Sequence, residues 1–559
     1  MATFNSRYLS CKQISELFIP TQNFYKVARP CHSVLLGARG SGKTTLLKML
    51  KPEAIKEFNA NGANLIIPFY GVYIPSDRQW SFILEQLDVQ NNSFYNNVSQ
   101  ALVNLNVLLA FLETLSYVLK EKETSIAETY NFCKILISFL KLDADTPPIL
   151  DIIRVSLRRY VLELQNAVQE QNIAYEFPFV CKSKFMDIIS PILDIVEIHF
   201  ADKGLTNSWA LCFDEMEIAP DWLQKEIINV HLRSRDQRIL FKITSTPDWS
   251  ISQKSLKDAS VGNDIEIIKC WITEYANIGE WKEFCDTVID NLILNKYNLT
   301  HKDLIGLIDT KLGDREYYLR ELPKVDSGFE EFFKRDYDID NKNKIVISRS
   351  SQRAKFYYWL ILAKRYSHFC ELADKPCEYN KFYLGNWLLY NMSDGNPRSL
   401  FNLLNDIVSY MMVNGELKMN LPALVKLVNN YSESALNERF AYCAMPPIQV
   451  RNRTLSFRDI LILIGEFFRK ELLGEIYNPF PRTMFAIDGE NKYRGFIHAG
   501  LEAGAIVRVD DKKQYSGRYN DGVYRLSYLL YPYFGYISTP TKDVVLISEI
   551  IKDEVYETE

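Results

Sequence analysis

Histidine is scarce in this chain of 559 residues, and its cysteines are not paired at metal-binding spacing. None of the six histidines stands four residues from another, and the ten cysteines form no Cys-x-x-Cys pair. A transition-metal site needs several such ligands close together, so the sequence predicts no zinc or iron centre. We expect the cysteines to be reduced and mostly buried.

A long apolar run is also missing. The best candidate for a membrane span, residues 107–119, is interrupted by Glu113. The first residues lack the basic, apolar and small-residue order of a secretory signal. We therefore expect a cytoplasmic protein without a membrane partner.

The composition is that of a folded protein. Apolar residues make up 47% and charged residues 24%, which supplies enough apolar surface for sizeable cores. The length exceeds what one hydrophobic core supports, so about two to four domains are expected. The net charge of -5 does not by itself favour nucleic acid, and any such binding would need a local basic patch.

A complete phosphate-binding loop is the most specific motif. Residues 37–44 read Gly-Ala-Arg-Gly-Ser-Gly-Lys-Thr, between an apolar run at 33–36 and a helix-like segment at 45–50. Glycines let the backbone curl until several N–H groups face a polyphosphate, and the following helix N-terminus adds positive charge. Lys43 can reach the β- and γ-phosphates, and the Thr44 hydroxyl can take a position on Mg²⁺. The residues predicted to line this pocket are Gly37, Ala38, Arg39, Gly40, Ser41, Gly42, Lys43, Thr44 and Thr45.

Two adjacent carboxylates, Asp214 and Glu215, follow the buried-strand pattern of residues 208–213. The carboxyl edge of a parallel sheet is where such folds hold ligands. An Asp there can orient Mg²⁺ through its water shell, and the adjoining Glu can polarise a water for attack on a γ-phosphate. The alternative, a pair of solvated acids in a loop, is the weaker interpretation beside a full phosphate loop.

Hydroxyl-bearing residues and an arginine are further candidates for the nucleotide site. The strand pattern at 238–246 ends in the hydroxyl-bearing residues Thr244 to Thr246, one of which could orient the attacking water; turn formation explains them equally well. Arg398 stands at the start of the helical run 399–409. A cation at a helix N-terminus opposes the helix dipole, so an anion such as a γ-phosphate facing Arg398 explains it better than an ordinary surface position does.

The last third of the chain has a different pattern. Residues 457–473 and 493–504 have the spacing of amphipathic helices, and 505–509 and 523–531 have the pattern of strands, which together indicate a winged helix. From 451 to 540, thirteen Arg and Lys stand against ten Asp and Glu, a mild excess. DNA contact and protein docking are equal alternatives for this region. On the DNA interpretation the contacting residues would include Lys492, Arg494, Lys512, Lys513, Arg518 and Arg525.

In order along the chain, the four elements resemble Walker A, Walker B, sensor 1 and sensor 2 of AAA+ ATPases. With the winged-helix pattern, the chain resembles the origin-recognition and initiator ATPases and is similar to their stand-alone bacterial relatives (STAND-like). The resemblance implies ATP and Mg²⁺ as cofactors, Thr44 and Asp214 as metal ligands, and Lys43, Glu215 and Arg398 as catalytic residues. Sensor 1 departs from the family, which usually has Asn there, so slow hydrolysis is implied.

The expected fold class is α/β: a P-loop NTPase core of the AAA+ type with a parallel sheet, followed by a helical lid and a winged-helix domain. Helical spacing at 101–122, 126–142 and 149–171 predicts an insertion within the core. The expected domains are a core at 1–265 with the insertion at about 80–200, a lid carrying sensor 2 at 266–440, a winged helix at 441–545 and an acidic tail at 546–559.

Two functions of different classes fit these features. The first is a switch that binds Mg-ATP, hydrolyses it to ADP and phosphate, and assembles on or regulates a DNA or protein partner, as a homo-oligomer or an effector complex. An arginine from a neighbouring subunit often completes an AAA+ site, and Arg233, Arg235 and Arg238 are candidates. The second is a nucleotide-sensing regulatory ATPase of a signalling or phage-defence (antiviral) system, with slow turnover and a protein effector.

Two further classes are disfavoured. A small-molecule kinase must exclude the water that Glu215 would activate. An ABC-type ATPase would carry a Leu-Ser-Gly-Gly-Gln signature, which the sequence lacks.

Overall fold

The computed structural model describes most of the chain, and the structural statements below refer to the described residues. These are 7–81, 92–205, 207–230, 232, 236–247, 265–271, 278–291, 315–339, 345–347, 354–373, 383–385, 388, 390–414, 421–440, 443, 445–450, 453–487, 491–509, 522–535, 537 and 543–551. They fall into two compact units. We call residues 7–37 and 42–270 the N-terminal unit, and residues 38–41 and 271–551 the C-terminal unit.

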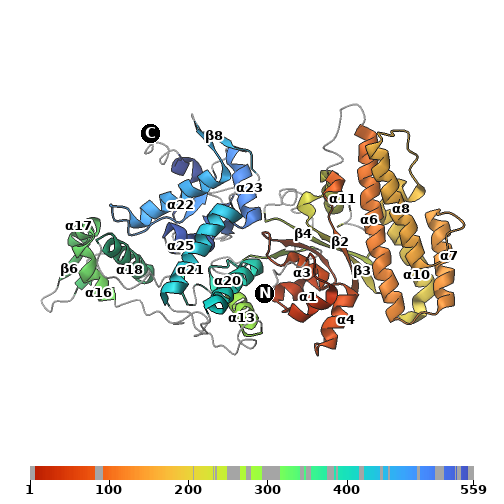
Figure 1. The fold of residues 1–559 in the computed structure, drawn as a ribbon, viewed down its shortest axis with the longest axis horizontal. Coiled ribbons are helices and arrows are strands. Elements are labelled where there is room, and N and C mark those ends of the chain that lie inside the picture. Colours follow the sequence, from red (N-terminus) through yellow and green to blue (C-terminus); the bar gives the residue numbers. More distant parts are fainter. Residues whose placement is uncertain are drawn as a thin grey trace. The chain divides into compact units, whose positions relative to one another are not determined.

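The N-terminal unit is built on a five-stranded parallel sheet, which confirms the predicted parallel α/β core. Its strands are β1 (His32–Leu36), β2 (Phe69–Pro75), β3 (Ser208–Asp214), β4 (Ile239–Ser245) and β5 (Ile265–Lys269). Their order across the sheet is β2-β3-β4-β1-β5 (Figure 1). The second strand starts at Phe69 rather than at the predicted residue 64.

Side chains of the sheet alternate between two hydrophobic cores, as expected for strands buried on both faces. On β3, Trp209 and Phe213 enter one core, and Ala210 and Cys212 enter the other. Four short helices supply the second core: α1 (Cys11–Leu17), α2 (Gln22–Val27), α3 (Lys43–Lys48) and α4 (Pro52–Ala60).

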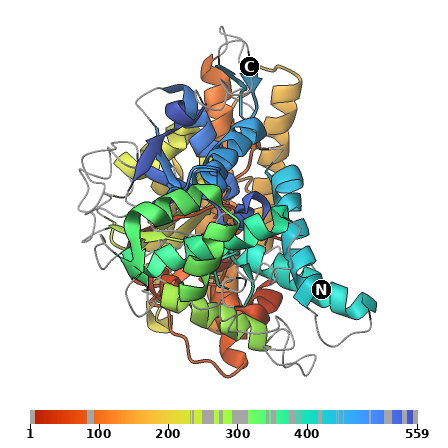
Figure 2. The same ribbon diagram turned by 90° about the vertical axis from the view of Figure 1, so that its left-hand side faces the viewer.

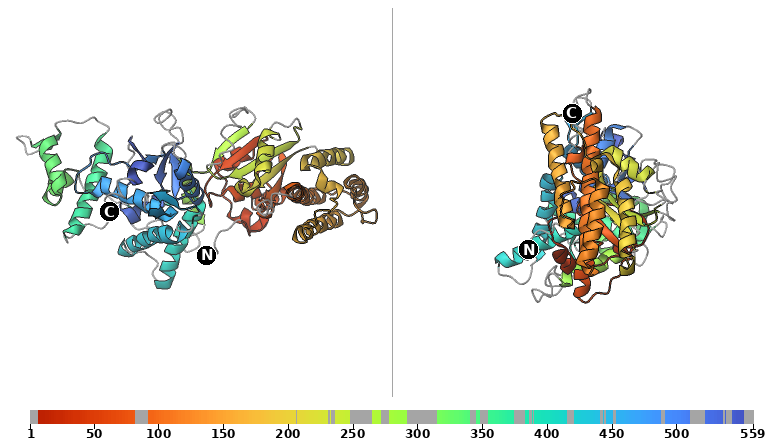
Figure 3. Two further views of the ribbon diagram at one scale, coloured as in Figure 1. Left: turned by 90° about the horizontal axis from the view of Figure 1, so that it is seen from above. Right: turned by 90° about the vertical axis from the view of Figure 1, so that its right-hand side faces the viewer.

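The predicted helical insertion is confirmed, and it forms part of the core. Its helices are α6 (Asn92–Glu121), α7 (Ile126–Leu140), α8 (Leu150–Gln169), α9 (Phe179–Lys182) and α10 (Phe185–Phe200), followed by the 3-10 turn η1 (Ala201–Lys203). Figures 1 and 3 show α6, α7, α8 and α10 as a bundle beside the sheet. The ring of Phe111 on α6 lies 4.9 Å from that of Trp209 on β3, centroid to centroid. The insertion therefore covers one face of the sheet, and removing it would expose that face.

Among the described helices, the segment Ser93–Glu121 has the length and apolar character to cross a membrane. In this structure 72% of its most apolar window is buried inside the protein. Its apolar side chains, including Phe111 and Leu115, belong to the core that covers the sheet.

One lysine is buried in the middle of the sheet. Lys242 on β4 is 0% exposed, and burial lowers its pKa to about 8. Its Nζ donates to the carbonyl oxygens of Arg29 and Cys31, at 2.7 and 2.5 Å, and to Ser33 Oγ at 2.9 Å. These bonds satisfy the buried ammonium group and fix the chain that enters β1, which the phosphate loop follows.

The larger part of the C-terminal unit is helical (Figure 2). Its helices up to residue 439 are α13 (Ile278–Ile289), α16 (Arg315–Glu321), η5 (Leu322–Lys324), α17 (Ser327–Asp336), α18 (Ala354–Leu372), α20 (Pro397–Asn414), α21 (Leu421–Ser434) and the π-helical turn η7 (Ala435–Arg439). Two short antiparallel pairs accompany them: β6 (Tyr337–Ile339) with β7 (Ile345–Ile347), and β8 (Ile448–Val450) with β9 (Arg453–Leu455).

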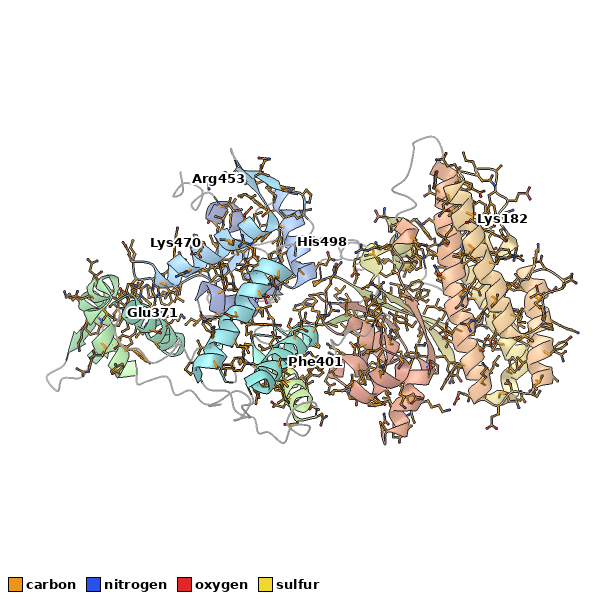
Figure 4. The ribbon with its side chains drawn as sticks, viewed as in Figure 1. Lys182, Glu371, Phe401, Arg453, Lys470 and His498 are labelled. Atoms are coloured by element: carbon orange, nitrogen blue, oxygen red, sulfur yellow. The ribbon has the colours of Figure 1, made fainter. Side chains whose placement is uncertain are left out.

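A four-stranded sheet ends this unit, in the order β11-β12-β10-β13. Its elements are α22 (Phe457–Leu473), β10 (Met484–Ala486), η8 (Asn491–Tyr493), α23 (Arg494–Ala503), β11 (Ile506–Val509), β12 (Val523–Leu526), η9 (Tyr528–Leu530), α25 (Tyr531–Phe534) and β13 (Val544–Leu546). Figure 4 labels Lys470 on α22 and His498 on α23. The helix at 457–473 is as predicted, and β11 and β12 pair antiparallel. Residues 510–521 of the predicted hairpin lie outside the described residues.

Two predictions for this region are wrong. The strand expected at 523–531 ends at Leu526, because the following aromatic and leucine residues turn into the helices η9 and α25 and are buried there. The tail expected from 546 is wrong for its first residues: Leu546 pairs with β10, and Ile547 and Ile550 are buried in a helical turn. Apolar residues between the acidic ones keep this segment in the fold.

Candidate functional site

The parallel sheet brings three predicted segments to one edge. Adjacent strands β3, β4 and β1 end at Asp214, Ser245 and Leu36. The acidic pair and the hydroxyl residues therefore lie at the ends of β3 and β4, and the phosphate loop follows β1. Leu36 stands in register with Ser245 on β4, and the Gly37 N–H donates to the Ser245 carbonyl oxygen at 3.1 Å. The loop therefore leaves β1 bonded to the end of β4.

The glycines of the loop have the backbone geometry that the motif predicts. Gly40 and Gly42 have φ angles of 88° and 89°, in the left-handed region that favours glycine. Helix α3 begins at Lys43, whose buried Nζ donates to the carbonyl oxygen of Gly37 at the start of the loop. The loop thus curls around its own lysine.

Residues Ala38–Ser41 of the loop group with the C-terminal unit. Within that unit, Asn396 Nδ2 donates to the Arg39 carbonyl oxygen at 2.9 Å, and the Arg398 N–H donates to that of Gly40 at 3.3 Å. A Cβ atom at Gly40 would stand 2.7 Å from Arg398 Cβ and 2.8 Å from Asn396 Oδ1. Glycine at position 40 is therefore required both by its φ angle and by the closeness of this turn.

Asp214 is buried and oriented by hydroxyl groups on both sides. Its Oδ1 accepts from Thr244 Oγ1 at 2.5 Å, and its Oδ2 accepts from the Tyr73 hydroxyl at 2.9 Å. Burial beside this carboxylate raises the pKa of Tyr73, which stays a donor. The carboxylate is fixed in one rotamer, as a metal-orienting group requires.

Glu215 has an uncommon backbone. Its φ of 55° lies in the left-handed region, which is rare for a residue other than glycine. Its N–H donates to Thr244 Oγ1 at 2.9 Å and to Asp214 Oδ1 at 3.1 Å. The side chain is 39% exposed, and its nearest charged partner, Arg7, lies 3.7 Å away. Thr244 thus holds both members of the acidic pair.

Several buried polar atoms near these strand ends have no hydrogen-bond partner in the described part of the chain. They are Glu217 Oε2 after β3, Ser245 Oγ at the end of β4 and Thr246 Oγ1 after it. Buried polar groups are normally hydrogen-bonded, so unpaired ones here fit a polar ligand. No group of three or more His, Cys, Asp or Glu among the described residues could hold a metal ion by itself. Mg²⁺ usually binds through one or two carboxylates together with substrate phosphates, and the buried Asp214 is one such carboxylate.

Arg398 lies in the C-terminal unit, whereas Lys43, Asp214 and Glu215 lie in the N-terminal unit. The predicted helix at 399–409 is α20, and Arg398 is its second residue. Asn396 caps this helix, because its Oδ1 accepts from the Ser399 N–H at 3.3 Å. Asp394 and Gly395 before it have φ angles of 56° and 72°, so two left-handed residues turn the chain into the helix.

Of the three arginines predicted as candidates for an arginine finger, the structure describes Arg238. Arg233 and Arg235 lie outside the described residues. Arg238 bonds within its own unit to Asp194 at 2.7 Å and to Asp236 at 2.9 Å. Its guanidinium lowers the pKa of Asp236 to about 2. Arg238 is therefore committed to carboxylates of its own unit.

The prediction of a DNA-contacting residue at position 525 is wrong. Arg525 is 2% exposed and paired with Asp394, so it cannot reach DNA. Lys492 and Arg494, at the start of α23, are exposed. Lys512, Lys513 and Arg518 lie outside the described residues.

Sequence reasoning missed Tyr73 and assigned no role to Glu217. The signal for Tyr73 was its place near the carboxyl end of β2, next to β3 in the sheet, where its register partner is Cys212. Glu217 follows the acidic pair, and burial raises the pKa of its carboxyl while Lys43 opposes this.

A family model described as ORC-CDC6-like matches residues 1–545. Comparison with curated proteins and with solved structures found no match.

Proposed function

The chain belongs to the ORC-CDC6-like family of AAA+ initiator-type ATPases, and on this premise we propose that it is a switch that binds Mg-ATP and hydrolyses it to ADP and phosphate. The observation that carries the proposal is the edge of the sheet, where Asp214 ends β3, Thr244 lies at the end of β4, and the loop starts after β1. Buried oxygens of Glu217, Ser245 and Thr246 near that edge have no hydrogen-bond partner in the described part of the chain, as expected where a polar ligand binds.

Each residue has a role in this proposal. The amides of the loop and Lys43 bind the phosphates, while Thr44 and Asp214 would hold Mg²⁺, which when bound would neutralise charge on the phosphates. Glu215 accepts a proton from the attacking water, and Thr244 Oγ1 holds Glu215 in place by accepting from the Glu215 N–H. Arg398 reads the γ-phosphate and so distinguishes ATP from ADP.

Titration of the protein with Mg-ATP in a calorimeter tests the proposal. We expect uptake of adenine nucleotide, dependence of phosphate release on Mg²⁺, and loss of release on adding a chelator. The absence of any adenine-nucleotide uptake would overturn the proposal. The mass in solution with and without ATP, and the nucleic acid carried through purification, distinguish the homo-oligomer, DNA and protein-effector alternatives.

The hydroxyl of Thr244 has a predicted effect of its own. Thr244→Val removes the bonds to Asp214 Oδ1 and to the Glu215 N–H but keeps the shape of the side chain. Hydrogen bonds to charged groups contribute about 1.5–3 kcal/mol, so we expect turnover to fall about tenfold or more, measured as phosphate release. Thr244→Ser, which keeps the hydroxyl, is the control and should retain most of the rate. Equal turnover in the valine variant and the parent would contradict the role of Thr244.

The bonds of Thr244 also favour a second candidate function, a nucleotide sensor. Its hydroxyl is committed to the acidic pair, whereas the resemblance to AAA+ ATPases implies an asparagine able to orient water at sensor 1. A nucleotide sensor with slow turnover and a protein effector, in signalling or phage defence, fits this arrangement. Tight nucleotide binding without stimulation by DNA, together with a co-purifying protein, would favour it. DNA-stimulated hydrolysis with an affinity that falls as salt rises would favour the first candidate.

A further inference from the structure

A buried ion pair links the turn before Arg398 to the C-terminal sheet. Arg525 Nη2 lies 2.7 Å from Asp394 Oδ1, and Arg525 Nη1 lies 3.0 Å from Asp394 Oδ2. The two side chains are 2% and 7% exposed. The contact is a two-bond fork within the C-terminal unit, between residues that are 131 positions apart.

Further bonds hold each partner in place. Asp394 Oδ2 also accepts from the Tyr528 N–H at 3.0 Å, and Arg525 Nη1 donates to the Leu526 carbonyl oxygen at 3.0 Å. The guanidinium lies over the Tyr528 ring, 3.8 Å from its centroid. Arg525 stands on β12, an inner strand of the C-terminal sheet. The carboxylate is thus anchored to the middle of that sheet.

The turn at residues 394–397 connects the anchored Asp394 directly to Arg398. Only Gly395, Asn396 and Pro397 separate it from Asp394, and proline fixes its own φ. Asp394 itself has a left-handed φ of 56°, and Asn396 is bonded to the loop at the Arg39 carbonyl oxygen. Because the backbone of these few residues is restricted, the position of Asp394 determines where α20 begins and where Arg398 lies.

Stability alone does not explain a buried pair, since well-packed apolar residues often stabilise a core as much or more. We propose that Asp394 and Arg525 are positioning residues: they hold Arg398 where it distinguishes a nucleoside triphosphate from a diphosphate, and they tie that reading to the C-terminal sheet. This inference rests on the proposed function, in which Arg398 contacts the γ-phosphate.

The same unit contains a matched pair for comparison. Arg365 Nε lies 2.6 Å from Asp326 Oδ2, and the side chains are 0% and 1% exposed. Arg365 also donates to the carbonyl oxygens of Leu472 and Gly474 at the end of α22, at 2.8 and 2.9 Å. This pair is as buried as the first but is not bonded to the turn before Arg398.

The test compares affinities for Mg-ATP and Mg-ADP in the parent, R525K, D394N and R365K proteins by calorimetry. Lysine keeps the charge at 525 without the two-bond fork, and asparagine tolerates the left-handed backbone at 394. We expect R525K and D394N to lose about tenfold in preference for ATP while keeping their affinity for ADP, because the loop alone holds a diphosphate. R365K should lower the melting temperature and keep the preference for ATP.

Two further variants separate the possible failures. R398A should lose the preference to the same extent as D394N. Unchanged preference in R398A would overturn both the role of Arg398 and this inference. Unchanged preference in R525K and D394N beside a changed R398A would overturn this inference alone. If the single variants fail to fold, D394N/R525Q leaves no unpaired buried charge and supports or overturns the inference by the same ratio.

Discussion

We expect the Lys43→Ala protein to lose the thermal stabilisation that Mg-ATP gives to the parent. A ligand at a hundredfold above its dissociation constant stabilises a protein by about 2.7 kcal/mol, a shift of several degrees in melting temperature. Lys43 is the buried cation inside the curl of the phosphate loop, so its removal takes away the charge opposite the phosphates. Melting curves with and without Mg-ATP measure the effect.

The quantity to compare is the shift and not the melting temperature itself. Lys43 also bonds the Gly37 carbonyl oxygen, so the alanine variant is expected to melt lower even without nucleotide. Lys56→Ala is the control, because Lys56 on α4 is exposed and pairs with Glu121 at the surface, at 2.8 Å. That variant should keep the full shift. A full shift in Lys43→Ala would show that the nucleotide binds elsewhere.

The parts of the site that the sequence predicts are those set by local pattern. Short apolar runs predict strands that are buried on both faces, and in a parallel sheet the residues at the carboxyl ends of the strands meet at one edge. The loop, Asp214 and Thr244 were predictable in this way, because each directly follows or ends a strand. The glycine angles at 40 and 42 follow from the loop motif itself.

Contacts between distant residues were not predictable from the sequence. Tyr73 and Asp214 are 141 positions apart, and only the order of the strands, β2 beside β3, brings them together. The burial of Arg525 could not be predicted either, because its ion-pair partner Asp394 is far away in the sequence. A count of basic residues does not distinguish a buried, paired arginine from an exposed one.

The insertion illustrates a third case. Its helical spacing was evident, but an amphipathic pattern does not say which surface the apolar side covers. In the structure that surface is one face of the sheet, with Phe111 against Trp209. The insertion therefore contributes to the stability of the sheet that carries the site.

We expect the Glu215→Gln protein to bind Mg-ATP as the parent does and to lose most of its turnover. Glutamine keeps the size of the side chain, and the backbone bonds from the Glu215 N–H to Thr244 and Asp214 do not depend on the carboxylate. The amide cannot accept a proton from water, and loss of a general base costs about 10²- to 10⁴-fold in rate. Calorimetry measures the binding and phosphate release measures the turnover.

The decisive comparison is the same change made two residues further on. Glu217 is a carboxyl group in the same segment, but its pKa is raised by burial, whereas the side chain of Glu215 is 39% exposed and accessible to water. A general base must reach the attacking water, and the more exposed carboxylate of Glu215 does so more readily than a buried one. Glu217→Gln should therefore retain more turnover than Glu215→Gln. Parental turnover in Glu215→Gln, or a loss confined to Glu217→Gln, would move the base to another residue and leave nucleotide binding by the loop unaffected.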